Sequence, residues 1–332
     1  MDVRPFDIAD DTLLRRFHQI IERADLFERP WNPSWSFEEL APMFRTPVSG
    51  ETWQAFAAFD GDEMVGAGFA VLPLDDNTEK LYSGFFVEPD HRRHGIGTAL
   101  VEHVVKVARE AGRNTVLCDT GIPYAERETH PYTLFAKRNG FTLACVEVHR
   151  VLQLPVDRSA IEAMQAECAP HHEGYELRTF HDEMPDELLE SYCYLENQLA
   201  LDAPTGDVDF EAEALTPAGY REREARRRAQ GRHKLTTLAI RDGEAVANTD
   251  LVVPREDMPK VYQWSTLVRR DHRGHHLGAA VKLRNLLALQ EHYPERTEIH
   301  TTNEETNQTM IGINERLGFR PVEICPEFVL RL

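Results

Sequence analysis

Apolar and polar residues recur along the whole chain with the periods of a mixed α/β protein. Two strands are predicted at residues 52–59 and 64–72, joined by the turn sequence DGDE, and a third, KLYSGFFV, ends at Val87. Residues 98–110 instead repeat their apolar positions at helical spacing. The other elements predicted in the first half are a strand near Val3, helices at 12–23 and 37–44, a strand at 115–120, a short helix ending at Gly140 and a strand at 142–154.

The second half repeats this order of elements. Its strands TTLAIR and AVANTDLVV flank the turn DGEA, and KVYQWSTLV ends at Val268 before another helical pattern at 279–292. The remaining predictions are strands at 175–180, 297–302 and 327–332 and helices at 186–201, 218–230 and 307–316.

Two pairs of similar segments indicate a duplication. DHRRHGIG at Asp90–Gly97 returns as DHRGHHLG at Asp271–Gly278, and RNGFTL at Arg138–Leu143 returns as RLGFRP at Arg316–Pro321. The offsets are nearly equal and the order is the same. A repeat of roughly 150–160 residues is too long for a solenoid and suits a tandem of full domains. We expect domains at 1–155 and 174–332, with a linker at 156–173 that holds at most one helical turn.

Composition and charge exclude some classes of binding partner. The 332 residues carry a formal net charge of −19, which disfavours nucleic-acid binding because phosphate affinity comes from clustered Lys and Arg. The sequence contains no apolar run of the roughly 18 residues that a membrane helix needs, and no signal-peptide pattern. Five scattered cysteines without a CxxC pair indicate free thiols in a reducing compartment. We therefore expect a cytoplasmic protein with neither nucleic-acid nor membrane partners.

In both halves a strand leads into the repeated basic loop, and a helix follows. This arrangement presents backbone N–H groups and a helix N-terminus to an anion, and Arg92 and Arg93 add charge for phosphate oxygens. The loop lacks both the GK[ST] of a P-loop and a complete GxGxxG. Its histidines have no Cys or Glu at ligand spacing, so no metal site is predicted there. A plain strand-to-helix turn with solvated charges is the alternative.

The motif Val87-x-Pro89-x-x-Arg92-Arg93-x-Gly95-Ile96-Gly97, followed by a helix, a strand, a short helix and Gly140-Phe141, resembles the GNAT superfamily of N-acetyltransferases. The resemblance covers almost all of each half and implies a tandem GNAT protein. Each domain is then expected to be an α/β (α+β) structure with a mixed, splayed, mostly antiparallel sheet flanked by helices. The implied cofactor is acetyl-CoA, bound where the fourth and fifth strands separate.

The resemblance also implies the residues that bind this cofactor. In the first half they are the strand backbone at Phe85, Phe86 and Val87 and the loop Arg92, Arg93, His94, Gly95, Ile96, Gly97 and Thr98. In the second half they are Leu267, Val268, Arg273, Gly274, His275, His276, Leu277 and Gly278, with Asn303 and Asn307 after the next strand. His276 replaces the inner glycine of the first loop, and the first half has Gly121 and Thr129 near the positions of the two asparagines. Each half therefore departs from the pattern in a different way, and Asn307 is equally explained as a helix N-cap.

The family reaction is attack of a neutral amine on the acetyl thioester, which needs a proton acceptor and a group that protonates the leaving thiolate. The position where the family often has a catalytic Tyr is Ala136 in the first half and Asn314 in the second. Tyr132, one helical turn earlier, is the candidate substitute, with a packing role as its alternative. Candidates for the acceptor pocket and the base are Tyr82, Trp264 and Thr266.

The sequence thus predicts an acetyl-CoA-dependent N-acetyltransferase that acts on a primary amine of a small molecule, with one active and one degenerate half. The tandem would act as a monomeric pseudo-dimer or as a homodimer. A non-catalytic acyl-CoA-binding or sensing protein, and an acetyltransferase for a protein amine, remain open as alternatives.

Overall fold

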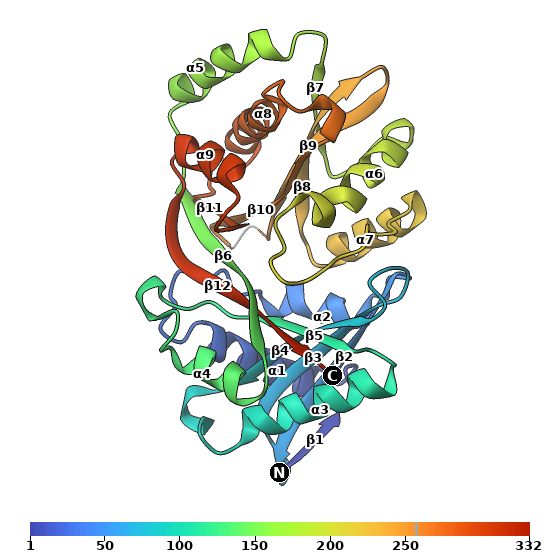
Figure 1. Ribbon diagram of the computed structural model, residues 1–332, viewed down its shortest axis with the longest axis vertical. Coiled ribbons are helices and arrows are strands. Elements are labelled where there is room, and N and C mark those ends of the chain that lie inside the picture. Colours follow the sequence, from blue (N-terminus) through green and yellow to red (C-terminus); the bar gives the residue numbers. More distant parts are fainter. Residues whose placement is uncertain (256–257) are drawn as a thin grey trace. The chain divides into compact units, whose positions relative to one another are not determined.

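The computed structural model describes residues 1–255 and 258–332, which fold into two compact units (Figure 1). Unit 1 comprises residues 1–147, 205–209 and 323–332, and unit 2 comprises residues 148–204 and 210–322. The units are not consecutive in sequence, whereas the expected domains are. The last ten residues of the chain belong to unit 1, and in Figure 1 the red C-terminal strand ends among its elements.

Unit 1 is built on a mixed sheet whose strands run in the order β1-β2-β3-β4-β5-β12. β1 to β4 are antiparallel neighbours, β4 and β5 are parallel, and β5 is antiparallel to β12. The strands are β1 Asp2–Pro5, β2 Glu51–Asp60, β3 Glu63–Pro73, β4 Lys80–Val87, β5 Thr115–Asp119, β6 Thr142–Gln153 and β12 Arg320–Arg331. The helices are α1 Asp11–Asp25, α2 Phe37–Arg45, α3 Ile96–Glu110 and α4 Pro131–Arg138.

Helices cover both faces of this sheet because each strand alternates its apolar side chains between two cores. One core packs Leu14 and Phe17 of α1 with α2 and strands β2 and β3. The other packs Leu100 and Val104 of α3 with α4 and strands β3 to β5 and β12. Unit 1 is therefore a three-layer structure with α1 and α2 on one face and α3 and α4 on the other.

Unit 2 repeats the plan with a sheet in the order β11-β10-β9-β8-β7. β10 and β11 are parallel, and the other neighbours are antiparallel. The strands are β7 Glu176–His181, β8 His233–Arg241, β9 Glu244–Val253, β10 Lys260–Val268 and β11 Glu298–Glu304. The helices are α5 Arg158–Cys168, α6 Asp186–Asp202, α7 Pro217–Ala229, α8 Leu277–His292 and α9 Gln308–Leu317. The predicted mixed, mostly antiparallel sheet flanked by helices is confirmed in both units.

Two predicted elements differ from the structure. The linker was expected to hold at most one helical turn, but it contains the 11-residue helix α5, which begins at the N-cap Asp157. This helix is stable because Ile161 and Cys168 are buried in the core beside α8. The closing strand was expected at 327–332 but begins at Arg320.

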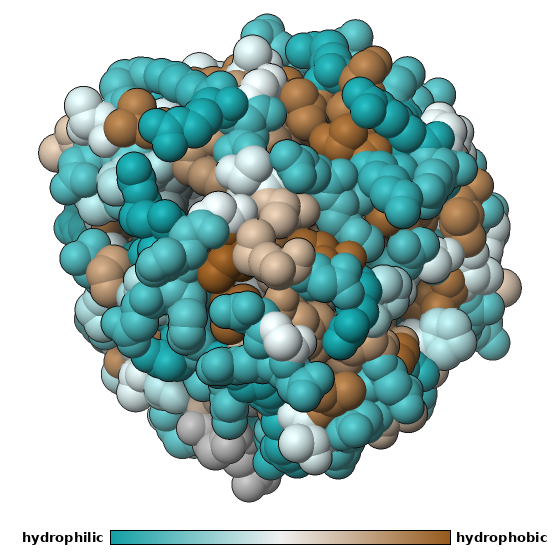
Figure 2. All heavy atoms as spheres, turned by 90° about the horizontal axis from the view of Figure 1, so that it is seen from below, coloured by the Kyte–Doolittle hydropathy of each residue, from teal (hydrophilic) through white to brown (hydrophobic). Residues whose placement is uncertain are grey.

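No helix in the described part of the chain is long and apolar enough to span a bilayer. The face shown in Figure 2 is mostly hydrophilic, with hydrophobic side chains scattered over it, as the net charge of −19 leads one to expect.

Candidate active site

The sheet of unit 1 splays between β4 and β5. β5 pairs with β4 only at residues 80–82, whereas β4 stays paired with β3 as far as Val87. The outer edge of the β4 segment at residues 83–87 therefore faces no strand among the described residues, and its backbone N–H and C=O groups can bind a ligand. Phe85 and Val87 turn their side chains into the core beneath α3, and Phe86 packs into the core beneath α1. The backbone rather than the side chains of these predicted site residues is thus available.

The first loop, Arg92–Gly97, follows this strand and leads into α3. Arg93 has a φ of 68° and Gly95 a φ of 83°, and α3 begins at Ile96 with Gly95 as its N-cap. A Cβ built on Gly95 would meet no atom within 4 Å, so the loop is open at this point. Arg93, His94 and Gly95 are exposed. The first N–H groups of α3, which have no partner in the helix, therefore face an open loop suited to an anion.

The basic side chains of the first loop have no carboxylate partner in the part of the chain that the structure describes. Arg92 donates from Nε to the carbonyl of Val87 at 3.1 Å, and its guanidinium lies over the rings of Phe27 and Tyr132. Arg93 makes no ion pair within these residues. Both positive charges are therefore free to attract a phosphate.

The second loop, Arg273–Gly278, has the same backbone conformation although His276 stands in the place of Gly95. Gly274 has a φ of 86° and His276 a φ of 53°, at the positions of Arg93 and Gly95. Each loop thus has one glycine and one non-glycine residue in the left-handed region, in exchanged positions. His276 does not disrupt the loop backbone, although a non-glycine residue there costs about 1–2 kcal/mol.

The side chains of the second loop nevertheless form contacts with other residues of unit 2. The ring of His276 stacks on His171 with centroids 3.8 Å apart and an interplanar angle of 9°, and the Nδ1 of His275 lies 3.1 Å from the His171 carbonyl. Arg273 forms an ion pair of 2.8 Å with Asp202, and the hydroxyl of Tyr175 lies 2.9 Å from the Nδ1 of His272. Side chains from α6 and from the segment after α5 therefore contact this loop and balance the charge of Arg273, although residues 273–276 remain exposed.

The two asparagines predicted to contact a cofactor in unit 2 are also engaged. Asn307 is the N-cap of α9, and its side chain accepts from the N–H of Met310 at 3.2 Å. Asn303 accepts a hydrogen bond of 2.5 Å from Asn314, the residue at the family's Tyr position. Asn314 in turn accepts a hydrogen bond of 2.9 Å from the buried Lys282. A structural role accounts for the contacts of both predicted residues.

Sequence analysis missed a group of four carboxyl side chains, the acidic cluster Asp25, Asp119, Glu323 and Glu327. Asp119 is the last residue of β5, Asp25 ends α1, and the two glutamates lie on β12. Asp119 and Glu327 are opposite each other in the β5–β12 ladder. Because Val116 and Cys118 of β5 turn toward α3, Asp119 must face the α1–α2 side. Only the tertiary structure brings these segments together, and no motif in the sequence marks them.

One cation partly balances the acidic cluster. Arg29 holds Glu323 in a bidentate ion pair with both distances at 2.7 Å. Desolvation raises the pKa of Asp25 to about 7, against the attraction of Arg29, and raises that of Glu327 to about 7, with the charge of Asp119 adding to the effect. Asp119 keeps solvent-accessible surface, yet desolvation by the surrounding protein raises its pKa as well. The carboxyls of Asp25 and Glu327, with pKa values of about 7, can exchange protons near neutral pH, and carboxyls with raised pKa values are typical of catalytic sites.

Asp25→Asn is expected to stabilise the protein in a pH-dependent way. A carboxyl whose pKa rises from 3.8 to about 7 on folding destabilises the folded state progressively as pH rises through this interval. The variant should therefore match the wild type near pH 4 and gain about 2 kcal/mol at pH 8, or roughly 4–8 °C in Tm. Thermal melts at both pH values test this, with Asp62→Asn on an exposed turn as the control. An equal gain at both pH values would contradict the assignment.

Tyr132, the predicted substitute for the general acid, lies in the first turn of α4 and is half-buried. Its ring lies 4.5 Å from that of His130 and 5.3 Å from the Arg92 guanidinium carbon. These ring contacts place it beside the first loop, and they account for the residue without a chemical role.

Tyr132→Phe is therefore expected to leave kcat within about threefold of the wild-type value, because phenylalanine keeps the ring contacts. Steady-state acetyl-transfer rates measure this. A fall of about 100-fold, the size of a lost general acid, would instead assign the hydroxyl a role in proton transfer.

The three predicted pocket residues have different surroundings. Tyr82 lies on β4 on the same face as Asp119. Trp264 is half exposed at a β-bulge of β10, where the register shifts between Gln263 and Thr266. The hydroxyl of Thr266 is already paired with Thr249 at 2.8 Å. Of the three, Tyr82 alone belongs to the face that carries the acidic cluster.

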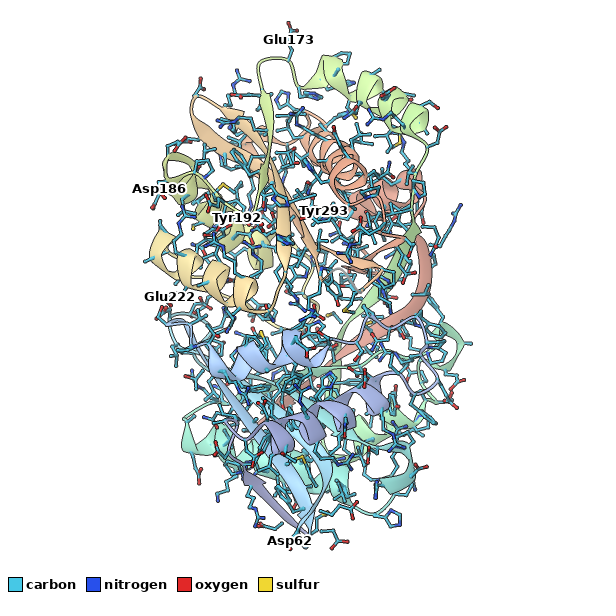
Figure 3. All side chains as sticks on the ribbon, turned by 180° about the vertical axis from the view of Figure 1, so that it is seen from behind. Asp62, Glu173, Asp186, Tyr192, Glu222 and Tyr293 are labelled. Atoms are coloured by element: carbon cyan, nitrogen blue, oxygen red, sulfur yellow. The ribbon has the colours of Figure 1, made fainter. Side chains whose placement is uncertain are left out.

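Unit 2 has a hydrogen-bonded polar network on β8, β9, β10 and α6. Asp250 accepts from Tyr192 at 2.6 Å, from Thr236 at 2.5 Å and from Ser265 at 3.1 Å. The buried Lys234 donates to the same tyrosine, which Figure 3 labels on α6 beside the strands of unit 2. Asp250 is thus held by donors from α6, β8 and β10, which leaves it poorly suited to act as a base.

Part of the chain is similar to known acetyltransferases. Residues 20–132 match the model of the Acetyltransferase (GNAT) family. The chain is 32% identical over 144 residues to N-acetyltransferase 8 of Homo sapiens, an alignment that covers 39% of this chain and 63% of that protein. The chain thus spans somewhat less than two thirds of the length of this curated relative.

Solved structures match over nearly the full length. A tandem GNAT protein from the clavulanic acid biosynthesis pathway has a TM-score of 0.77 and 24% identity, with 99% of this chain and 98% of that chain covered. A GCN5-related N-acetyltransferase from Sphaerobacter thermophilus has a TM-score of 0.65 and 17% identity, with 99% and 95% covered. At these identities the likeness establishes the fold.

Proposed function

We propose that this chain, which matches the GNAT family model over residues 20–132 and has the fold of a tandem GNAT protein, is an acetyl-CoA-dependent N-acetyltransferase whose chemistry takes place in unit 1. The acceptor is a primary amine of a small molecule, and the second loop of unit 2 does not hold a cofactor. The observation that carries this proposal is a contrast in charge: Arg92 and Arg93 of the first loop have no carboxylate partner among the described residues, whereas Arg273 of the second loop is paired with Asp202.

The residues of unit 1 fit acetyl-CoA. The cofactor has a pyrophosphate, which suits the open N-terminus of α3, the unpaired Arg93 and the space beside Gly95. Its pantetheine arm has amide groups, which suit the unpaired backbone edge of β4 at residues 83–87. Acetyl-CoA supplies an acetyl thioester as the group that an amine attacks.

The acidic cluster supports an amine acceptor. A primary amine is protonated at neutral pH, so carboxylates attract it, and one of them must take its proton before nitrogen can attack the carbonyl carbon. The new C–N bond forms as the C–S bond breaks. A carboxyl whose pKa is raised by desolvation suits this proton transfer, and Asp119, on the strand that borders the splay, is the proposed base.

The absence of the family's Tyr at Ala136 does not prevent this reaction. A thiol with a pKa near 8.5 leaves as a thiolate with little assistance, and it can recover its proton from water. The same absence is the observation that favours the second candidate function, a protein that binds acyl-CoA without turnover.

Native mass spectrometry of the full chain with acetyl-CoA tests the proposal directly. We expect one bound molecule, and release of free thiol when a pool of small amines is added. Binding without turnover across the pool would favour the sensor. No binding would refute both functions, and two bound molecules would show that the contacts of His276 and Asp202 do not block the second loop.

A further inference from the structure

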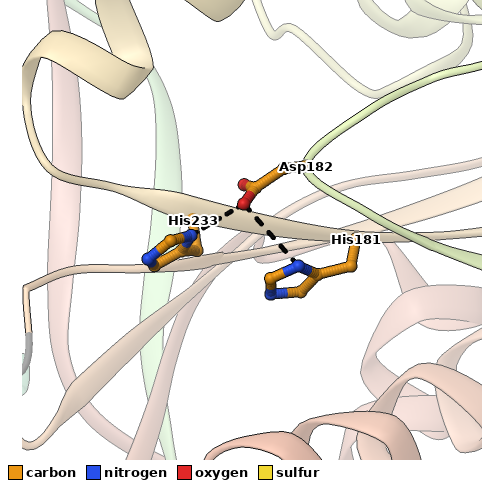
Figure 4. Close-up of side chains that lie close together, drawn as sticks. All are labelled: His181, Asp182 and His233. Atoms are coloured by element: carbon orange, nitrogen blue, oxygen red, sulfur yellow. Dashed lines mark hydrogen bonds and ion pairs between the residues drawn. The ribbon is translucent and has the colours of Figure 1, made fainter.

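Two imidazoles and one carboxylate converge at one end of unit 2, on the β7–β8 side of the sheet. The Nδ1 of His233 lies 2.7 Å from the Oδ2 of Asp182, and the Nδ1 of His181 lies 3.6 Å from the same oxygen (Figure 4). The three ligand atoms all lie within 4.8 Å of one another. The geometry points to a binding site for a divalent transition-metal ion of the zinc class, formed by His181, Asp182 and His233.

The backbone fixes the three ligands. His181 ends β7 and His233 begins β8, so the antiparallel ladder, in which His181 faces Leu235, places both side chains at one end of the sheet. Asp182 has a φ of 64°, and it exchanges hydrogen bonds with Lys234. Its backbone N–H donates to the Lys234 carbonyl at 2.8 Å, and its Oδ1 accepts from the Lys234 N–H at 3.0 Å. The carboxylate is therefore held with Oδ2 toward the imidazoles.

Surrounding side chains orient the ligands in the way that outer-shell groups orient metal ligands. The Nε2 of His181 lies 2.5 Å from the hydroxyl of Tyr293, so its Nδ1 remains for a metal. Arg227 donates to the Oδ1 of Asp182 at 2.8 Å, which leaves Oδ2 to the metal. The positive charge of Arg227 opposes a cation, so we expect affinity in the micromolar range rather than the tightest binding.

Metal binding requires the ligand atoms to shift. Tetrahedral zinc with bonds of about 2.0–2.2 Å places its ligand atoms about 3.3 Å apart, between the observed 2.7 and 3.6 Å to Asp182, and the two imidazole nitrogens, which lie within 4.8 Å of each other, adjust to the same separation. His181 and His233 are half exposed, so water has access to the fourth position. His292, whose ring centre lies 5.8 Å from that of His181, is an alternative to water as the fourth ligand. Imidazole and carboxylate donors select zinc, nickel or cobalt over magnesium or calcium.

Cobalt and zinc binding to the full chain, stripped with a chelator, test the site. Titration followed by the visible absorption of Co²⁺ and by Zn²⁺ calorimetry should give one ion per chain. His233→Gln and Asp182→Asn should each weaken binding at least tenfold. His171→Gln, in the histidine group at the second loop, is the matched control and should bind as the wild type does. Wild-type affinity in His233→Gln, or loss of binding in His171→Gln alone, would overturn the proposal.

A second test uses the wild-type protein, so it does not require that any variant folds. X-ray absorption of the zinc-loaded protein should show two imidazoles among nitrogen and oxygen ligands. A sulfur ligand near 2.3 Å, or no imidazole, would place the ion elsewhere and refute the site. The result is independent of acetyl transfer, because none of the three ligands belongs to unit 1.

Discussion

Gly95→Glu is expected to weaken acetyl-CoA binding at least 100-fold. A side chain at this position projects into the open space of the first loop, where a Cβ meets no atom within 4 Å, and its carboxylate would lie where the pyrophosphate is proposed to bind. Two like charges about 4 Å apart at the surface repel by up to about 4 kcal/mol, and each 1.4 kcal/mol is tenfold in affinity. Calorimetric titration with acetyl-CoA measures the change.

The second loop provides the matched control. His276 occupies the equivalent left-handed position at the N-terminus of α8, so His276→Glu introduces the same charge into the same backbone geometry. We expect less than about a threefold change in affinity, because the second loop is not proposed to bind the cofactor. Gly95→Asn separates strain from charge, since Asn tolerates the left-handed region, and it should retain most of the affinity. A large loss in His276→Glu with wild-type affinity in Gly95→Glu would move the site to unit 2.

Asp119→Asn is expected to lower kcat/KM for the amine by about 100-fold while the affinity for acetyl-CoA stays unchanged. The amide has the shape of the carboxyl but cannot take the proton of an ammonium group, and a general base contributes about 10²–10⁴-fold. Because the pKa of Asp119 is raised, wild-type kcat/KM should fall as the pH is lowered and this carboxyl becomes protonated. The variant should lose this acid limb.

Asp62→Asn is the control for this substitution, because it makes the same change in unit 1 on the β2–β3 turn, labelled at the lower end of Figure 3. It should keep both kcat/KM and the pH profile. Wild-type kcat/KM in Asp119→Asn would exclude Asp119 as the base. In that case Glu327, opposite it in the ladder and with a pKa of about 7, becomes the carboxyl to replace next.

The sequence by itself determined the features that depend on neighbouring residues. Strand and helix periods placed β4 and β10 at their observed bounds, because apolar alternation reflects local burial on a sheet. The repeated DHRRHGIG and DHRGHHLG segments located both strand–loop–helix turns, because the backbone conformation of the turn itself favours glycine. These local signals were sufficient for the fold and for the positions of both loops.

The tertiary structure alone decided which loop has its arginine paired and where the acidic cluster lies. His171 and Asp202 contact the second loop from segments about 70–100 residues away in the sequence, and Glu327 meets Asp119 across more than 200 residues. The residues at 181, 182 and 233 likewise converge only when β7 pairs with β8. Such contacts produce no periodic pattern in the sequence, because they depend on strand order and on side chains from distant elements. The sequence therefore predicted two similar loops, and only the packing around them distinguished one from the other.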